Sequence, residues 1–228
     1  MPFCRHAIYY TPPPGPLARF GAAWLGWDMA KARPVAHPDI PGLPAPLPQI
    51  TATPRRYGFH ATIKPPFRMA DGQTTAELDA ALAAFCASRA PVPLGVLTLT
   101  RLGRFLALLA SRNTGALNLL ASDTVRRFDS FRAPMTPAEF SRRDLPHLSD
   151  DQRANLRIWG YPHVMADFRW HMTLTGKLPA AQARATMAAL EPVLHPLLES
   201  EISIDALSLV GETTEGHFHL ISRHLLRG

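Results

Sequence analysis

Residues 56–67, RYGFHATIKPPF, place a histidine and a threonine two positions apart in an otherwise apolar stretch that ends at two prolines. Side chains alternate between the two faces of a β-strand, so His60 and Thr62 are expected on one face and the apolar residues around them on the other. By the same parity Lys64 follows them. The stretch therefore predicts a strand with one core-facing side and one side that carries an imidazole, a hydroxyl and a cation.

Residues 168–178, FRWHMTLTGKL, repeat this pattern in the second half of the chain. His171 and Thr173 are expected to share a strand face, with Thr175 and Lys177 further along it. Each copy has an aromatic residue just before the histidine and a lysine beyond the threonine. A single histidine of this kind is more simply explained as a half-buried structural residue. Two matched copies, one in each half of the chain, favour a functional pair.

Strand-like and helix-like segments alternate along the rest of the sequence. Strands are predicted at residues 3–10, in a hairpin at 92–111 with its turn at 101–104, and twice within 200–225. Helices are predicted within 17–32, 71–89 (capped by Thr74 or Thr75), 114–132, 136–158 (interrupted at Pro146) and 180–200. The alternation is too irregular for a doubly wound parallel sheet, so the fold class is predicted to be α+β with largely antiparallel sheets.

A proline-rich segment, residues 34–54, separates the first predicted helix from the first motif. Proline fixes its own backbone and lacks an amide proton, so we expect neither a helix nor a central strand here. The segment is predicted to be a loop or a binding flap.

Composition places the chain among soluble globular proteins, with 46% hydrophobic and 18% charged residues in 228. No apolar run is long enough to span a membrane, and the first residues lack the features of a signal peptide, so a cytoplasmic protein is expected. Cys4 and Cys86 stand in no metal-binding pattern. A net charge of +6 favours an anionic partner, either a small charged ligand or the end of a nucleic acid.

The tetrapeptides HATI, beginning at His60, and HMTL, beginning at His171, resemble the paired His-x-Thr-x signatures of the 2H (two-histidine) phosphoesterase superfamily. Their flanks resemble more narrowly the branch encoded beside phosphonate-degradation genes. The resemblance implies two pseudo-symmetric lobes of antiparallel sheet with outer helices, facing each other across a central cleft. We accordingly expect residues 1–228 to form one bilobal catalytic domain, with a helical insertion around 112–160 that sets it apart from the smaller RNA-processing members.

Two facing histidines suit phosphodiester hydrolysis, because imidazole exchanges a proton near neutral pH and can act as general base or general acid. Which histidine takes which role is open. Threonine hydroxyls can donate hydrogen bonds to the phosphoryl oxygens. The predicted catalytic residues are thus His60, Thr62, His171 and Thr173; the predicted substrate-binding residues are Lys64, Lys177, Thr175, Tyr9, Arg56 and Tyr57. No cofactor and no metal are expected.

Two other functions remain open at this stage. An RNA- or nucleotide-binding module could keep the pocket for recognition without turnover, and its binding would depend strongly on salt. A zinc hydrolase could combine His60 and His171 with His217 or His219. The preferred prediction is a metal-independent phosphodiesterase for a small sugar, nucleotide or phosphonate-pathway metabolite, with an RNA end as a further candidate substrate.

Overall fold

The computed structural model describes residues 3–112 and 115–228. Within these residues the central feature is a seven-stranded sheet in which every neighbouring pair is antiparallel. From one edge to the other its strands are β11 (Phe218–Leu225), β10 (Ala206–Glu212), β1 (Arg5–Tyr10), β4 (Ala61–Phe67), β8 (His171–Thr173), β7 (Phe105–Ala110) and β6 (Leu97–Leu102). The predicted α+β class with antiparallel sheets is confirmed.

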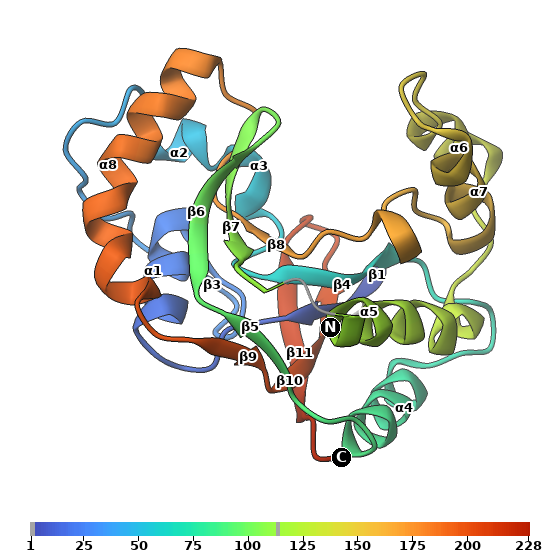
Figure 1. Cartoon of the computed structure of the whole chain (residues 1–228). Coiled ribbons are helices and arrows are strands. Elements are labelled where there is room, and N and C mark those ends of the chain that lie inside the picture. The colour runs from blue at the N-terminus through green and yellow to red at the C-terminus, as the bar shows by residue number, and fades with distance from the viewer. Residues whose placement is uncertain (1–2, 113–114) are drawn as a thin grey trace.

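Two short ribbons and a set of helices complete the described fold (Figure 1). The ribbons pair β2 (Trp27–Asp28) with β3 (Arg33–Pro34) and β5 (Val92–Gly95) with β9 (Ile202–Ile204). The helices are α1 (Pro16–Leu25), α2 (Leu47–Ile50), α3 (Ala52–Arg55), α4 (Thr75–Ala87), α5 (Gly115–Arg127), α6 (Pro137–Arg143), α7 (Asp150–Trp159) and α8 (Ala180–Leu198), with 3-10 turns η1 (Asp129–Phe131) and η2 (Met165–Asp167).

The two expected lobes are the two halves of this one sheet. One half contains β11, β10, β1 and β4, and the other contains β8, β7 and β6. They meet where Ala61 of β4 pairs with Met172 of β8. Helix α4 contacts β10 and β11, α5 contacts β4, and α8 contacts β6 and β7, so each half has its own outer helices (Figure 1). Each half also contributes one of the two motifs.

The hydrophobic core lies between the sheet and these helices. Ile8, Ile63, Leu108 and Met172, from four neighbouring strands, are all fully buried in it. Their burial helps to hold the two halves of the sheet together, at roughly 1.5–3 kcal/mol for each large apolar side chain. A second, smaller hydrophobic cluster contains Ala7 and Tyr9 of β1 and Val210 of β10.

Local signals set the start of α4 as the sequence predicts, whereas the helix predicted within 17–32 ends at Leu25 and is followed by β2. Thr74 begins α4 by accepting a hydrogen bond from the Glu77 amide at 3.2 Å, and the Glu77 carboxylate accepts from the Thr74 amide at 2.8 Å. The charged segment 136–158 is broken around Pro146 into α6 and α7. Among the described residues, none of these helices is long and apolar enough to cross a membrane.

The proline-rich segment differs from its prediction at one end. Residues 34–46 are irregular apart from the end of β3, but α2 and α3 follow them, so the expectation that residues 34–54 contain no helix is wrong. Pro48 and Pro54 both lie in the first turn of their helices, where a backbone amide has no intrahelical partner to lose.

Candidate active site

The two motifs lie on adjacent central strands. Thr62 pairs with Tyr9 of β1, while His171 and Thr173 pair with Leu109 and Ala107 of β7. Because β4 and β8 are antiparallel and pair directly, the motifs run past each other in opposite directions. His60 lies just before β4 and His171 opens β8, so the strands predicted over 56–67 and 168–178 are both shorter than expected.

One cavity of about 800 Å³ is lined by all four motif residues, His60, Thr62, His171 and Thr173. Its wall continues with aromatic and basic side chains from β1, from the segment after α7 and from the turn that leads into β8. A cavity of this size accommodates a small-molecule ligand. The structure therefore brings the two halves of the predicted catalytic set to one ligand-sized space.

Both histidines are held in the same way. The Nδ1–H of His60 donates to the carbonyl oxygen of Gly58 at 2.9 Å, and the Nδ1–H of His171 donates to that of Arg169 at 2.8 Å. A carbonyl oxygen only accepts, so Nδ1 must carry the proton in both neutral rings and Nε2 must carry the lone pair. Nε2 of His60 lies 3.1 Å from Oγ1 of Thr62. Each Nε2 is thus the ring nitrogen that can take up a proton, and that of His60 accepts the hydrogen bond of the Thr62 hydroxyl.

Burial disfavours the charged form of both rings. It lowers the pKa of His60 to about 4, with a further lowering from the charge of His171 and an opposing contribution from the Gly58 carbonyl. Burial also lowers the pKa of His171, and the Arg169 carbonyl opposes it. The influence of His171 on His60 indicates that the two imidazoles lie within electrostatic range of each other.

Tyr9 and Tyr57, two of the predicted substrate-binding residues, line the same cavity. The Tyr9 ring is fully buried and stacks on the His60 imidazole, with ring centroids 3.6 Å apart. Tyr57 lies further away, 6.5 Å from the same imidazole. These placements agree with a role beside the first motif.

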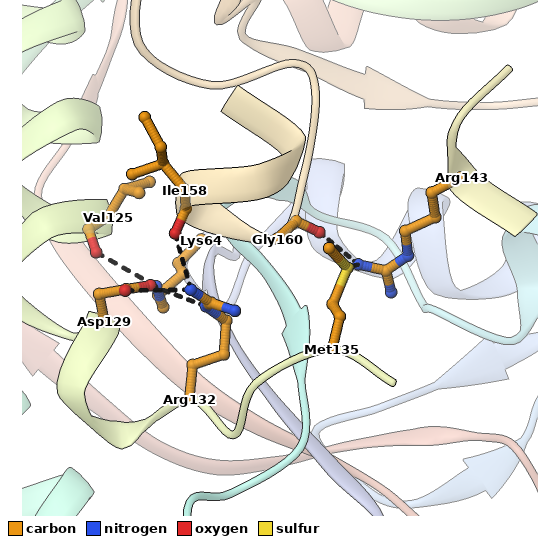
Figure 2. Close-up of polar contacts among 8 residues, drawn as sticks. All are labelled: Lys64, Val125, Asp129, Arg132, Met135, Arg143, Ile158 and Gly160. Atoms are coloured by element: carbon orange, nitrogen blue, oxygen red, sulfur yellow. Dashed lines mark hydrogen bonds and ion pairs between the residues drawn. The ribbon is translucent and has the colours of Figure 1, made fainter. Parts of the chain in front are cut away.

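Strand parity predicted that Lys64 lies on the cavity side of β4. In the structure it does not. Its side chain is 2% exposed, and Nζ donates to the carbonyl oxygen of Val125 at 3.1 Å and lies 3.5 Å from Asp129 (Figure 2). The register between β1 and β4 slips by one residue, so that Tyr9 faces Thr62 but Ile8 faces Lys64. A β-bulge of this kind turns the following side chain to the other face of the sheet.

Three other predicted substrate-binding residues lie outside the cavity lining. Thr175 is buried, where its hydroxyl accepts from the Leu106 amide at 3.0 Å and donates to the Gly176 carbonyl at 2.8 Å. Lys177 is exposed beyond the end of β8. Arg56 lies beside Gly216. Because β8 ends at Thr173, the alternation predicted for Thr175 and Lys177 does not continue.

The sequence prediction missed several basic and aromatic residues of the cavity wall. Arg5, Arg143 and Tyr161 line it, together with His163 and Arg169. Arg5 shares the strand face of Tyr9 by simple parity and could have been found that way. The others come from α6 and from irregular segments, where a single sequence carries no periodic signal.

Within residues 3–112 and 115–228 no group of three or more His, Cys, Asp or Glu side chains is placed to hold a metal ion. His217 packs on the indole of Trp27, with centroids 4.4 Å apart, and His219 lies 5.4 Å from the same ring. Neither lines the cavity of His60 and His171. The third ligand that the zinc alternative requires is therefore elsewhere in the fold.

Comparison with known proteins gives one family match and one group of relatives. Residues 62–219 match the family described as "Protein of unknown function (DUF1045)". A protein of Janthinobacterium sp. (strain Marseille), named "Ribose 1,5-bisphosphate phosphokinase PhnN", is 37% identical over 218 residues, which cover 93% of this chain and 48% of the relative. The chain spans less than half the length of the curated relatives it matches.

Solved structures show only a distant likeness. TT0787 of Thermus thermophilus is 16% identical with a TM-score of 0.46, and each chain is covered to 98%. E. coli LigT, solved in complex with 3'-AMP, is 14% identical with a TM-score of 0.40, and each chain is covered completely at 100%. At these TM-scores the two structures say nothing about the activity of this chain.

Proposed function

The chain belongs to the DUF1045 family, which is associated with phosphonate metabolism, and we propose that it hydrolyses a phosphodiester of a small metabolite by two-histidine general acid/base catalysis. The relationship to the phosphonate-associated branch of the 2H phosphoesterases is supported by the two His-x-Thr-x motifs themselves. The proposed substrate is a cyclic or linear phosphodiester of a sugar, a nucleotide or a phosphonate-pathway intermediate. The proposed reaction needs no metal ion.

The observation that supports this proposal best is the matched orientation of the two imidazoles in one cavity. Each donates Nδ1–H to the carbonyl oxygen two residues earlier, and each therefore offers Nε2 for proton transfer. A purely structural histidine has no need of a matched partner with the same tautomer beside a ligand-sized cavity. The arrangement fits a reaction that removes one proton and supplies another at a single phosphoryl group.

The chemistry can be written with these groups alone. Nε2 of one neutral imidazole takes a proton from water as the water oxygen bonds to phosphorus. Nε2–H of the other imidazole, in its protonated form, gives its proton to the ester oxygen as the phosphorus–oxygen bond breaks. Thr173 donates a hydroxyl hydrogen bond to a phosphoryl oxygen, where negative charge accumulates in the transition state, and Thr62 does the same once Nε2 of His60 is protonated and no longer accepts from it. An anionic phosphodiester also raises the pKa of the nearby imidazoles, which favours the protonated acid.

The kinase name of the Janthinobacterium relative suggests a different reaction. This chain lacks the GxxxxGK[ST] phosphate-binding motif: its single Gly-Lys pair, Gly176–Lys177, is followed by a leucine. The chain covers only 48% of that relative. We therefore assign any phosphokinase activity to the part of the relative that this chain does not match, and a phosphodiesterase to the part that it does.

A substrate screen tests the proposed function. Cyclic and linear phosphodiesters, among them nucleoside 2',3'-cyclic phosphates and bis(p-nitrophenyl) phosphate, are incubated with the wild type with and without EDTA. The variants are His60→Gln and His171→Gln, and the control is His195→Gln, whose ring is exposed on α8. We expect turnover in EDTA and a loss of about 10²-fold or more in each motif variant, with no change in the control. Binding without any turnover would support the nucleotide-binding alternative instead.

A further inference from the structure

Three phenols and two guanidinium groups gather on one part of the cavity wall. Tyr9, Tyr57, Tyr161, Arg5 and Arg143 all line it. Burial raises the pKa of Tyr9 and that of Tyr161; Arg5, Tyr57 and Tyr161 act electrostatically on the Tyr9 hydroxyl, and Arg143 and Tyr57 act on that of Tyr161. Because such effects weaken with distance, these groups lie within electrostatic range of one another. We call these five residues the Tyr/Arg cluster.

The cluster carries positive charge that the described protein does not fully balance. Arg5 has a carboxylate partner, Glu212, which accepts two hydrogen bonds from its guanidinium group. Arg143 instead donates to the carbonyl oxygen of Gly160 and contacts the sulfur of Met135 (Figure 2). No carboxylate within residues 3–112 and 115–228 forms an ion pair with it. Burial and the neighbouring charge of Arg5 both lower the pKa of Arg143, and together they outweigh the opposing effect of the more distant Glu139.

The cluster also contains a hydrogen-bond donor without a partner. The Tyr9 hydroxyl is buried, the residue is 0% exposed, and within the described chain no protein atom accepts its hydrogen bond. A buried hydroxyl in this state is destabilising unless something else satisfies it. Because Tyr9 lines the cavity, the missing acceptor can be supplied by a ligand.

We propose that the Tyr/Arg cluster is a second anion subsite, which binds a phosphate monoester group of the same molecule whose phosphodiester is hydrolysed. This inference rests on the proposed function and narrows its substrate class to phosphodiesters that carry an additional terminal phosphate. A phosphate monoester has three terminal oxygens and close to two negative charges, which suits two guanidinium groups and up to three phenol hydroxyls better than a carboxylate does.

The position of the subsite follows from the stacking of Tyr9 on His60. The face of the Tyr9 ring covers the imidazole, and its hydroxyl lies within electrostatic range of Arg5, Tyr57 and Tyr161. Arg5, Arg143 and Tyr161 also line a second, much smaller hollow that adjoins the main cavity. The subsite therefore lies on the His60 side of the same cavity.

A matched pair of substrates tests the subsite. Adenosine 2',3'-cyclic phosphate and the same compound with a 5'-phosphate differ only in the group that the cluster would bind. We expect the wild type to show a kcat/KM at least about tenfold higher for the 5'-phosphorylated compound. Arg143→Gln should remove most of this preference. The control Arg142→Gln changes the neighbouring exposed arginine of α6, which lines neither hollow, and should keep it.

Failure of the proposed subsite and failure of the proposed phosphodiesterase activity give different results. A wild type that hydrolyses both compounds equally, or an Arg143→Gln variant that keeps the full preference, would overturn the subsite while leaving the phosphodiesterase intact.

If neither compound is hydrolysed, calorimetry with adenosine 5'-phosphate and with adenosine tests the subsite independently of turnover. The subsite predicts tighter binding of the phosphorylated ligand by the wild type and a loss of at least about tenfold in Arg143→Gln but not in Arg142→Gln. Equal binding by both variants would refute it.

Discussion

Tyr9 lies nearly parallel to His60, with ring planes inclined by 17° and centroids 3.6 Å apart. The contact shields one face of the imidazole from water, and burial is the main cause that lowers the pKa of His60 to about 4. Tyr9 also faces Thr62 across the β1–β4 pairing. Tyr9 thus sets the environment of His60 and also contributes its hydroxyl to the Tyr/Arg cluster.

Replacing Tyr9 by phenylalanine should separate these two roles. The stacked ring is kept, and the buried hydroxyl without a partner is removed, so the free energy of unfolding of the unliganded protein should rise by about 1 kcal/mol. Urea unfolding measures this change. A clear loss of stability in Tyr9→Phe would mean that the hydroxyl is already satisfied in the free protein, contrary to the account above.

The pH dependence of kcat/KM should be bell-shaped with an acidic optimum. The reaction requires one histidine neutral and the other protonated, and in the free enzyme both pKa values lie below 6.5, that of His60 at about 4. The maximum falls between the two pKa values, so activity should decline above pH 6.5 as the protonated acid is lost. Initial rates at low substrate concentration across pH 4–9 measure this profile. An optimum at pH 8 or above would be inconsistent with the burial of both rings.

Thr62→Val and Thr173→Val should each lower kcat by roughly 10- to 100-fold with little change in stability. Valine has nearly the shape of threonine but cannot donate a hydrogen bond to the phosphoryl oxygens, whose charge grows in the transition state. Steady-state kinetics and a thermal unfolding curve for each variant provide the test. Unchanged kcat in both variants would restrict these hydroxyls to a structural role.

Lys64→Met should leave phosphodiester hydrolysis within about threefold of the wild type, because the amine contacts α5 and η1 and does not line the cavity of the motif residues. Burial lowers the pKa of Lys64 to about 8, so between pH 8 and 10.5 the unfolded state binds more protons than the folded state. Wild-type stability should therefore rise across this range, and the rise should be smaller in Lys64→Met. Stability curves at pH 8 and pH 10 measure the difference. A loss of activity larger than tenfold would indicate that Lys64 binds the substrate after all.

The order of strand-like and helix-like segments predicted the fold class, and the resemblance to the 2H phosphoesterases implied that the two motifs meet at one cavity. The alternation within each motif predicted that His60 shares a strand face with Thr62 and His171 with Thr173, because sheet parity is a local property. The same reasoning failed at Lys64, where the register slips against β1. A bulge depends on the partner strand, which the local sequence does not reveal.

The Tyr/Arg cluster could not be predicted in the same way. Arg5 belongs to β1, Arg143 ends α6, and Tyr161 follows α7. These residues are brought together only when the helices α6 and α7 fold back beside the sheet, which no periodicity within either segment indicates. Composition offered a hint, since a net charge of +6 favoured an anionic ligand, but it could not say where that ligand binds.

The central claim is that the two imidazoles act on one phosphoryl group, and a crystal structure with a bound tetrahedral oxyanion tests it most directly. Crystals soaked with tungstate, which has strong anomalous scattering, would locate the anion independently of the protein. The account predicts one anion within about 3.2 Å of Nε2 of both His60 and His171, with the hydroxyls of Thr62 and Thr173 on its remaining oxygens. An anion that contacts a single histidine, with the second ring too far away to reach it, would contradict the claim.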